Sequence, residues 1–439
     1  MKILLISPLT GDGSRREKGL LWPSLALYIL EGLTPEEHTV KIVEEEFESI
    51  PLKEKFDLVG ISCMTANAPR AYLLADHFRL KGTKVVVGGI HPAILPDEAL
   101  QHADSVVIGE AEGVWKRVID DMAAGHLQPK YHNTDPDPDL SIYIPKNFSN
   151  ILKRKPFNIL PIITTRGCPY DCDFCSVTNI YGKKIRHIPV ENVVKDIVDS
   201  GSKKVIFYDD NIIGQSKYAK ELFKAIKPLN IKWGGQATIS LINDTELLQL
   251  AVESGCMGLL IGLESISEYQ MDSMKKCIKN RDQLRLALKD IMKMGILVHA
   301  TIIFGFDSDT IEVFEDTVRF LIDCKISSVS FCILTPLPGT RTYENLLKEG
   351  RLITSDWKYY NNRTVVFRPR NMSPHELQTG NWQAKKDFYR INSIIRRLSG
   401  NVKHVGLHLI SNITYIKHVN SERERIKILD EELFTSWKI

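Results

Sequence analysis

Apolar and polar positions alternate in two long blocks along the chain. In the first block, helical patterns over Ser24–Leu33 and Ala68–Leu80 separate short apolar runs. The expected strands are Ile3–Ser7, Val40–Val43, Leu58–Ser62, Lys84–Gly88 and Ser105–Ile108. Strand–helix alternation at this spacing is typical of a parallel, doubly wound sheet. The sequence therefore predicts an α/β domain over residues 1–130 and a linker over 131–155.

The second block runs over residues 156–345. Its expected strands are Ile159–Thr165, Lys204–Tyr208, Lys232–Ala237, Gly258–Gly262, Leu297–Phe304 and Ser328–Leu334. Helical patterns lie between them over Val190–Ser200, Lys217–Ala225, Asp244–Ser254, Arg281–Met294 and Ile311–Cys324. A second parallel α/β unit is the expected result.

The alternation stops beyond residue 345, and we expect a mainly helical domain over 346–439. Pro374–Leu398 carries helical spacing, and Ser373-Pro374-His375-Glu376 before it reads as an N-cap, a proline in the first turn and an acid. Lysine and arginine number 16 against 8 acids over residues 351–439, a net charge of +8 (16 − 8).

Length and composition exclude several classes of protein. The 439 residues allow two or three domains, and a net charge of +3 implies no bulk attraction to nucleic acid. No apolar run approaches the roughly 20 residues of a membrane span, and the start of the chain is too short for a signal peptide. We expect the scattered cysteines Cys63, Cys256, Cys277, Cys324 and Cys332 to be small core residues in a reduced, cytoplasmic protein.

The remaining three cysteines carry the chemistry. Cys168, Cys172 and Cys175 follow the strand Ile159–Thr165 with the spacing C-x3-C-x2-C. Thiolates suit iron–sulfur clusters and zinc, but a structural zinc site needs four ligands, usually as two separated pairs. A four-iron cluster held by three cysteines leaves one iron open to a substrate. We favour this open cluster over a zinc site or an accidental grouping.

The motif Cys168-x3-Cys172-x-Phe174-Cys175 resembles that of the radical S-adenosylmethionine (SAM) superfamily. The resemblance implies that these cysteines hold a [4Fe–4S] cluster whose open iron binds SAM. One electron from the cluster then cleaves SAM and gives a 5′-deoxyadenosyl radical that abstracts hydrogen. Phe174 would pack near the adenine. The six strand–helix repeats fit the partial (β/α)6, TIM-like barrel of that superfamily, whose sites gather at the carboxyl ends of the strands.

Polar residues at those strand ends become candidates for SAM binding. Asp209 and Asp210 end the second strand and either start a turn or hold the ammonium group of SAM. Gln236 ends the third strand. Gly262-Leu263-Glu264-Ser265 resembles the G-x-E-S element of the family, in which Glu264 would bind the ribose hydroxyls; the alternative is an acid at a helix start. Gly305-Phe306-Asp307 and Thr335–Thr340 also match the family pattern.

Three segments of the first domain resemble the cobalamin-binding, Rossmann-type domain of cobalamin-dependent radical SAM enzymes: Trp22-Pro23-Ser24-Leu25, Gly88-Gly89-Ile90-His91-Pro92 and Gly109-Glu110-Ala111-Glu112. Ligands bind beyond the carboxyl ends of such strands. The candidate cobalamin contacts are Ser62, Thr65, Gly88, Gly89, His91, Gly109 and Glu110. Taken alone, the glycines are ordinary turn residues, and His91 is equally a loop histidine bonded to backbone. The D-x-H-x-x-G motif that places histidine on cobalt is absent.

The C-terminal region resembles that of hopanoid methylases and bacteriochlorophyll side-chain methylases, which implies a hydrophobic substrate. Arg396-Arg397, Lys385-Lys386 and the aromatics Trp382, Phe388 and Tyr389 either touch an anionic membrane surface, which would make the protein peripheral to the inner membrane, or form a solvated face.

Three functions stay open at this point. The first is cobalamin-dependent methylation of an unactivated carbon in a small-molecule or lipid substrate, with flavodoxin or ferredoxin as electron donor. The second is a radical reaction without methyl transfer, such as ring formation, rearrangement or oxidation. The third is a degenerate corrinoid- or cluster-binding sensor, against which the intact cysteine triad argues.

Overall fold

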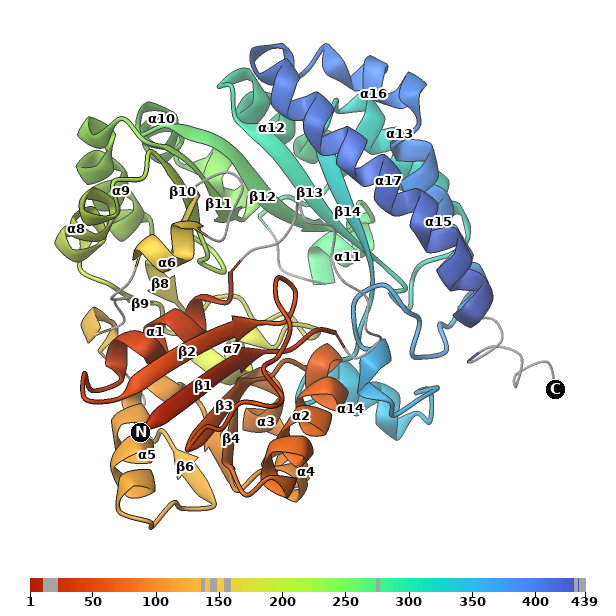
Figure 1. Cartoon of the computed structure of the whole chain (residues 1–439). Coiled ribbons are helices and arrows are strands. Elements are labelled where there is room, and N and C mark those ends of the chain that lie inside the picture. Colours follow the sequence, from red (N-terminus) through yellow and green to blue (C-terminus); the bar gives the residue numbers. More distant parts are fainter. Residues whose placement is uncertain are drawn as a thin grey trace.

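The computed structural model describes residues 1–10, 23–135, 139–142, 148–153, 159–273, 277–429 and 433. Two parallel six-stranded sheets form the body of this part of the chain (Figure 1). Helices pack on both faces of the first sheet, and further helices cover the second. The fold is the α/β architecture that the sequence predicts, with a helical C-terminal region.

The first sheet has the strand order β2-β1-β3-β4-β5-β6. Its strands are β1 (Lys2–Ser7), β2 (Thr39–Glu44), β3 (Leu58–Ser62), β4 (Lys84–Gly88), β5 (Ser105–Ile108) and β6 (Lys130–His132). The five expected strands are confirmed. β6 was not expected, because it has only three residues, lysine, tyrosine and histidine, and no apolar run. It pairs with β5 at the edge of the sheet, where the linker was predicted to begin.

Alternate residues of these strands enter two separate cores, because successive side chains of a strand point to opposite faces. Ile3 and Leu5 pack with helices α1 (Leu25–Leu33) and α5 (Trp115–Ala123), while Leu4 and Ile6 pack with α2 (Ala68–Leu80). The short helices α3 (Ile90–Ile94) and α4 (Pro96–His102) follow β4. The sheet is thus doubly wound.

The second sheet has the order β14-β13-β12-β11-β10-β7. Its strands are β7 (Leu160–Ile162), β10 (Lys204–Phe207), β11 (Lys232–Ala237), β12 (Cys256–Glu264), β13 (Leu297–Phe304) and β14 (Ser328–Ile333). The connecting helices are α8 (Val190–Ser200), α9 (Ser216–Ile226), α10 (Thr245–Glu253), α11 (Glu268–Ser273), α12 (Arg281–Lys293) and α13 (Glu312–Asp323). The first expected strand is divided: after β7 the chain forms β8 (Thr165–Arg166), which pairs antiparallel with β9 (Arg186–His187).

The remaining helices are α6 (Phe148–Lys153), α7 (Val177–Tyr181), α14 (Arg341–Lys348), α15 (Pro374–Phe388), α16 (Ile391–Leu398) and α17 (Val405–Leu429). Short 3-10 helices occupy Thr65–Asn67, Ala111–Gly113, Leu140–Ile142, Lys227–Leu229, Ile239–Asn243, Trp357–Tyr359 and Val402–His404. The predicted boundary at residue 345 falls within α14.

The capping residues expected at Ser373 and Glu376 are confirmed. The Ser373 hydroxyl accepts a hydrogen bond from the Glu376 N–H, and the Ser373 N–H donates to the Glu376 carboxylate. The single expected helix over Pro374–Leu398 is wrong, because it is broken between α15 and α16. The hydroxyl of Tyr389, at the break, donates to the Val329 carbonyl (2.6 Å) and accepts from its N–H (2.9 Å) at the free edge of β14.

The surface expected around Lys385, Arg397, Phe388 and Tyr389 is also wrong, because all four side chains are buried. Lys385 pairs with Glu422 (2.9 Å), and Arg397 is fully enclosed between the C-terminal helices and the second sheet. Of the scattered cysteines, Cys63, Cys256 and Cys324 are buried and Cys332 is half-buried, as expected; Cys277 is exposed and is not a core residue.

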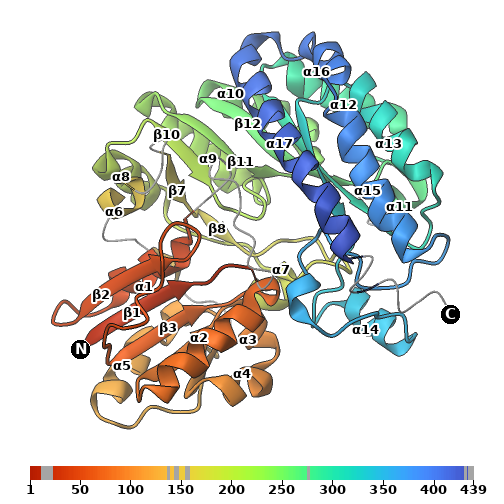
Figure 2. The same ribbon diagram turned by 45° about the vertical axis from the view of Figure 1, so that its right-hand side comes forward.

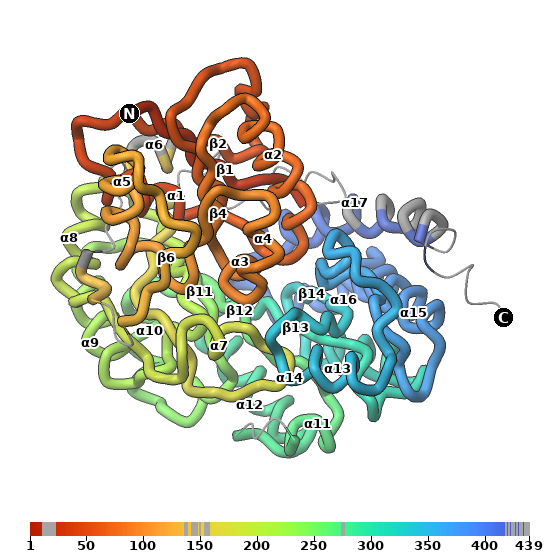
Figure 3. Tube along the Cα trace, turned by 90° about the horizontal axis from the view of Figure 1, so that it is seen from below, coloured from red at the N-terminus to blue at the C-terminus, as the bar shows by residue number. Residues whose placement is uncertain are grey.

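The two sheets meet through the loops at their strand ends. The first sheet lies below the second, with α7 between them (Figure 1, Figure 2). Seen from below, α3, α7 and α14 lie close together (Figure 3). The Asn179 side chain at α7 donates to the Gly339 carbonyl just before α14, and the side chain of Ile94 in α3 packs against Gly339.

Candidate active site

The three motif cysteines lie in the loop between β8 and α7 (the cluster loop, residues 167–176). All three are half-buried and none forms a disulfide within the described residues, and the Cys175 N–H donates to the Cys172 carbonyl (3.1 Å). Burial raises the pKa of Cys175 to about 11, and negative charge on Cys172, Asp210 and Cys168 adds to the effect. One loop therefore carries three thiols, the number of donors that a cluster with one open iron requires. In the described residues they are not drawn together into a group that could hold a metal ion.

The cluster loop is held on one side by α14. The Arg341 guanidinium donates to the carboxylates of Asp173 (2.7 Å) and Asp171 (3.0 Å) and to the Asp171 carbonyl (2.6 Å). Lys183 forms a second ion pair with Asp171 (2.7 Å). Asp171 and Asp173 lie between the cysteines in sequence, so these contacts fix the backbone that carries the thiols.

The first domain holds the loop on its other side. Arg166, directly before the loop, donates to the carboxylates of Glu110 (2.9 Å) and Glu112 (2.5 Å), and Arg186 also binds Glu110. Arg166, Arg186 and Glu110 are each less than a tenth exposed. Glu110 was expected to contact cobalamin, but its carboxylate accepts hydrogen bonds from two guanidinium groups. Breaking a buried pair on one side is costly, because the remaining charge is left without a partner.

The two acids that end β10 have different surroundings. The Asp209 carboxylate is buried and accepts hydrogen bonds from the N–H and hydroxyl groups of Thr164 and Thr165. It braces the strand end before the cluster loop. Asp210 has no hydrogen-bond donor on its carboxylate within the described residues, and burial raises its pKa to about 6. The adjacent buried Asn211 carries a side-chain oxygen that likewise finds no partner in that part of the chain.

An acceptor carboxylate and an acceptor amide oxygen without donors fit a cationic donor group beside the thiols. The ammonium group of SAM has this chemistry. The side chain of Gln236, the third-strand candidate, donates to the Asp210 carbonyl (2.9 Å) and so supports the loop that carries Asp210.

Glu264 is the last residue of β12 and adopts a positive φ of 64°. Residues other than glycine rarely do so, and such strain concentrates at functional sites. The pairing of β12 with β13 shifts register between Gly262 and Glu264, and the Glu264 carboxylate folds back over Gly262, where a Cβ would overlap it. Helix α11 begins only at Glu268, so Glu264 is no helix-start acid.

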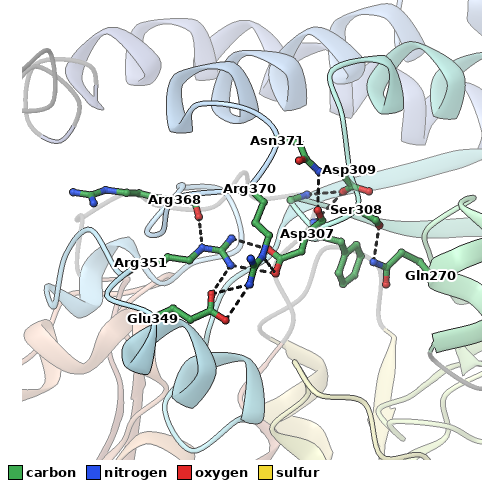
Figure 4. A network of polar contacts seen from close by, with 11 residues as sticks. Gln270, Asp307, Ser308, Asp309, Glu349, Arg351, Arg368, Arg370 and Asn371 are labelled. Atoms are coloured by element: carbon green, nitrogen blue, oxygen red, sulfur yellow. Dashed lines mark hydrogen bonds and ion pairs between the residues drawn. The ribbon is translucent and has the colours of Figure 1, made fainter.

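Phe174 packs edge-to-face on Phe306 from the loop after β13, with ring centroids 6.0 Å apart. A polar network holds that loop (Figure 4). Arg351 (2.6 Å) and Arg370 (2.6 Å) both donate to the Asp307 carboxylate, and the Gly305 and Phe306 N–H groups donate to Asp309. The segment after α14 therefore positions the aromatic pair at the cluster loop.

The expected cobalamin contacts lie along one edge of the first sheet. Ser62, Gly88, Gly89 and Gly109 are half-buried, while Thr65 is buried. Gly89 has a φ of 105°, and a Cβ there would lie 2.6 Å from the Cys63 carbonyl oxygen. Backbone and small side chains at this edge fit a flat, bulky ligand. Trp22 lies outside the described residues.

His91 is fully buried in α3 and is not a loop histidine bonded to backbone. Its Nε2 lies 3.1 Å from Glu98, whose carboxylate also accepts from Tyr72 and from Trp357 of the segment after α14. The Nδ1 atom has no partner within the described residues. His91 therefore ties the first domain to the segment around Trp357.

Sequence reasoning missed Arg166, Arg341 and Asn211. Arg166 and Asn211 adjoin predicted site residues, and that adjacency was the available signal. Arg341 is 166 residues distant from Cys175 in sequence (341 − 175), and nothing local marks it.

Two family models match the chain. The radical SAM superfamily matches residues 162–321, and the B12 binding domain matches residues 19–119. The chain therefore contains a B12-binding domain followed by a radical SAM domain. The matched ranges include β2 to β5 of the first sheet and β10 to β13 of the second. The cofactors expected from the sequence, a [4Fe–4S] cluster, SAM and cobalamin, are those of the two families.

Relatives of this radical SAM enzyme include two methylases. The bacteriochlorophyllide d C-12(1)-methyltransferase of Chlorobaculum tepidum is 29% identical, over 91% of this chain and 90% of that protein. The hopanoid C-2 methylase of Rhodopseudomonas palustris is 23% identical, over 87% of this chain and 74% of the relative.

A solved structure shares the fold. The radical SAM methyltransferase TsrM of Kitasatospora setae, with cobalamin and a [4Fe–4S] cluster bound, superposes with a TM-score of 0.71 over 96% of this chain and 99% of that one, at 14% identity. No helix in the described part of our chain has the length and apolarity that a membrane crossing requires.

Proposed function

We propose that this enzyme transfers a methyl group to an unactivated carbon of a small-molecule or lipid substrate. The observation that carries the proposal is the direct contact of Glu110, from the B12-binding domain, with Arg166 at the start of the cluster loop. This contact supports a single site shared by the two kinds of cofactor. When bound, the cluster with SAM supplies hydrogen abstraction, and cobalamin supplies the methyl group.

The residues have separate roles in this proposal. Cys168, Cys172 and Cys175 hold the cluster. Asp210 and Asn211 accept hydrogen bonds from the SAM ammonium group, and Glu264 accepts from its ribose. Phe174 packs near the adenine, while Gly262 leaves room for the Glu264 carboxylate. Ser62, Thr65, Gly88, Gly89 and Gly109 border the cobalamin.

The substrate class is proposed from the relatives, which act on bacteriochlorophyllide and on hopanoids. A hydrophobic ring system is the chemistry these share. We include a flavodoxin or ferredoxin as electron donor and a peripheral contact with the inner membrane. Domain limits of 1–130, 156–345 and 346–439 remain part of the proposal. Because both relatives are methylases, ring formation, rearrangement and oxidation are less favoured.

The test uses anaerobically reconstituted, cobalamin-supplemented protein and SAM deuterated in its methyl group. We expect bound corrinoid and labelled methyl in a product from a hydrophobic pigment or lipid extract, detected by mass spectrometry. The triple variant with Cys168, Cys172 and Cys175 changed to alanine should lose iron, sulfide and product together. If the protein binds no corrinoid, or if its product carries no label, methyl transfer is rejected. A radical reaction without methyl transfer then becomes the favoured function.

A further inference from the structure

Helices α16 and α17, and the short 3-10 helix between them, expose several of their apolar residues. We call Ile391, Ile395, Val402, Leu407, Ile410 and Ile413 the C-terminal apolar face. Ile391, Ile395, Val402 and Ile410 are each more than 60% exposed, at 69%, 62%, 67% and 61%. Spacings of three and four residues place them together on the outer sides of their helices.

The inner side of the same helices is polar. The buried Arg397 guanidinium donates to the carbonyls of Ser327 (2.7 Å) and Phe388 (3.0 Å) and to the side-chain oxygen of Asn412 (2.7 Å). His408 and Asn412 are fully buried. A surface helix of a globular protein normally shows the reverse pattern, apolar inward and polar outward. These polar bonds attach the helices together with the buried Ile394 and Val419. The outward isoleucines lie on the opposite side and mark an interaction surface.

The chain segment that carries this face holds charges of one sign. Residues 388–421 contain five lysines and arginines and no aspartate or glutamate. Arg396, Lys403 and Lys417 are exposed beside the apolar face. A partner that accepts this face must therefore offer negative charge next to an apolar interior.

A basic pocket of about 470 Å³ adjoins the face. It lies between the end of α12, the start of β13 and residues 399–404, and Val402 belongs to both features. Its lining includes the cations Arg285, Lys289, Lys293, Lys325 and Lys403. Asp323 is the one acid in the lining, and it lies 3.8 Å from Arg396. The pocket suits a phosphate group.

We propose that the C-terminal apolar face docks on an anionic lipid bilayer, with the isoleucines at the acyl boundary and the basic pocket on lipid phosphates. Charge complementarity selects this partner, because a second copy of the chain would bring two cationic surfaces together. α16 and the start of α17 lie at the end of the molecule away from the first sheet (Figure 1), so docking leaves the cluster loop unobstructed. The inference deepens the peripheral contact proposed above and does not depend on the chemistry.

Vesicle flotation tests the proposal with the full-length protein. Vesicles of phosphatidylcholine alone are compared with vesicles that also contain phosphatidylglycerol. We expect binding to the anionic vesicles, weakened by salt. The double variant Lys289→Glu/Lys403→Glu should bind at least about tenfold more weakly, since each basic residue near an anionic surface contributes about 1 kcal/mol. The double variant Ile395→Asp/Ile410→Asp should also bind at least about tenfold more weakly, because it puts charge at the acyl boundary.

Matched controls separate this surface from general effects. Leu80→Asp changes an apolar side chain that is 89% exposed on α2, and Lys217→Glu changes an exposed lysine of α9; both should bind like the parent protein. Thermal unfolding of every variant checks the fold. Vesicle binding that all four variants share with the parent would overturn the proposal. The proposal would also be overturned if the parent protein did not bind vesicles but formed a dimer that Ile395→Asp abolished. Binding of inorganic phosphate without binding of vesicles would overturn it as well. Cofactor content and SAM cleavage are measured separately, so a failed methylation assay leaves the vesicle result intact.

Discussion

Arg166 and Glu110 form a buried ion pair (2.9 Å) that joins the loop after β5 of the first sheet to the residue preceding the cluster loop. Glu110 also binds Arg186, and Glu112 binds Arg166 (2.5 Å). Two guanidinium groups and two carboxylates therefore neutralise one another where the two sheets meet. The position of the cysteines relative to the B12-binding domain depends on this balance.

Replacing Glu110 with glutamine should destabilise the protein by about 3 kcal/mol, because two buried guanidinium groups lose their shared charge partner. Urea unfolding of the cofactor-free protein measures the change. Asp120→Asn removes an exposed ion pair with Lys116 and should cost less than about 1 kcal/mol. A stable Glu110→Gln protein that loses only corrinoid would return Glu110 to the role of cobalamin contact.

The adjacent acids of β10 should respond differently to the same substitution. Asp209→Asn removes acceptors from Thr164 and Thr165 and should destabilise the protein by roughly 1–3 kcal/mol, with poorer cluster retention. Asp210→Asn should leave stability and iron content unchanged and weaken SAM binding about tenfold. Equilibrium binding and iron analysis of both variants decide the assignment; equal SAM affinity of the Asp210 variant and the parent would contradict it.

Glu264→Gln should also weaken SAM binding about tenfold or more, because one charge-assisted hydrogen bond is lost. Glu268→Gln, at the true start of α11, is the control and should bind SAM normally. Gly262→Ala should match the Glu264 variant, since a Cβ there displaces the carboxylate. If the Glu264 variant keeps full affinity, its positive φ has another cause.

His91→Ala should leave the visible spectrum of bound cobalamin unchanged, because the D-x-H-x-x-G frame is absent and the His91 ring is turned to Glu98. The variant should lose roughly 1–3 kcal/mol of stability, because the Glu98 carboxylate loses its His91 partner while Tyr72 and Trp357 still donate to it. A spectral shift on substitution would instead place this histidine on cobalt.

His299 predicts a pH dependence of stability. Its ring nitrogens lie 2.8 Å and 2.9 Å from the hydroxyls of Ser328 and Ser330, and burial lowers its pKa to about 4. The unfolded chain, with a histidine pKa of about 6.5, takes up the proton first as the pH falls, so stability is lost between about pH 6.5 and pH 4. His299→Gln should remove about 2 kcal/mol of the difference between pH 7 and pH 5. Urea unfolding at both pH values measures it, and an unchanged difference would exclude His299 as the source.

Local patterns were enough for much of this molecule. The spacing of Cys168, Cys172 and Cys175 and the strand before them identified the chemistry, because ligation within one loop depends only on neighbours in sequence. Strands such as Leu58–Ser62 and Lys84–Gly88 were predicted to the residue, since a buried parallel strand is a continuous apolar run between turn residues. The radical SAM family match agrees with the chemistry.

Contacts between distant segments were decided only by the tertiary structure. Glu110 looked like a ligand contact until Arg166 and Arg186 met its carboxylate, and Asp209 could not be told from Asp210 until Thr164 and Thr165 came within hydrogen-bonding distance. The basic residue Arg397 faces the interior and the isoleucines of α17 face outward, against the usual pattern. The sequence determines which charged and polar groups the chain has. Which of them are buried, and which partners they bind, depends on packing between segments far apart in the sequence, and no local pattern predicts that packing.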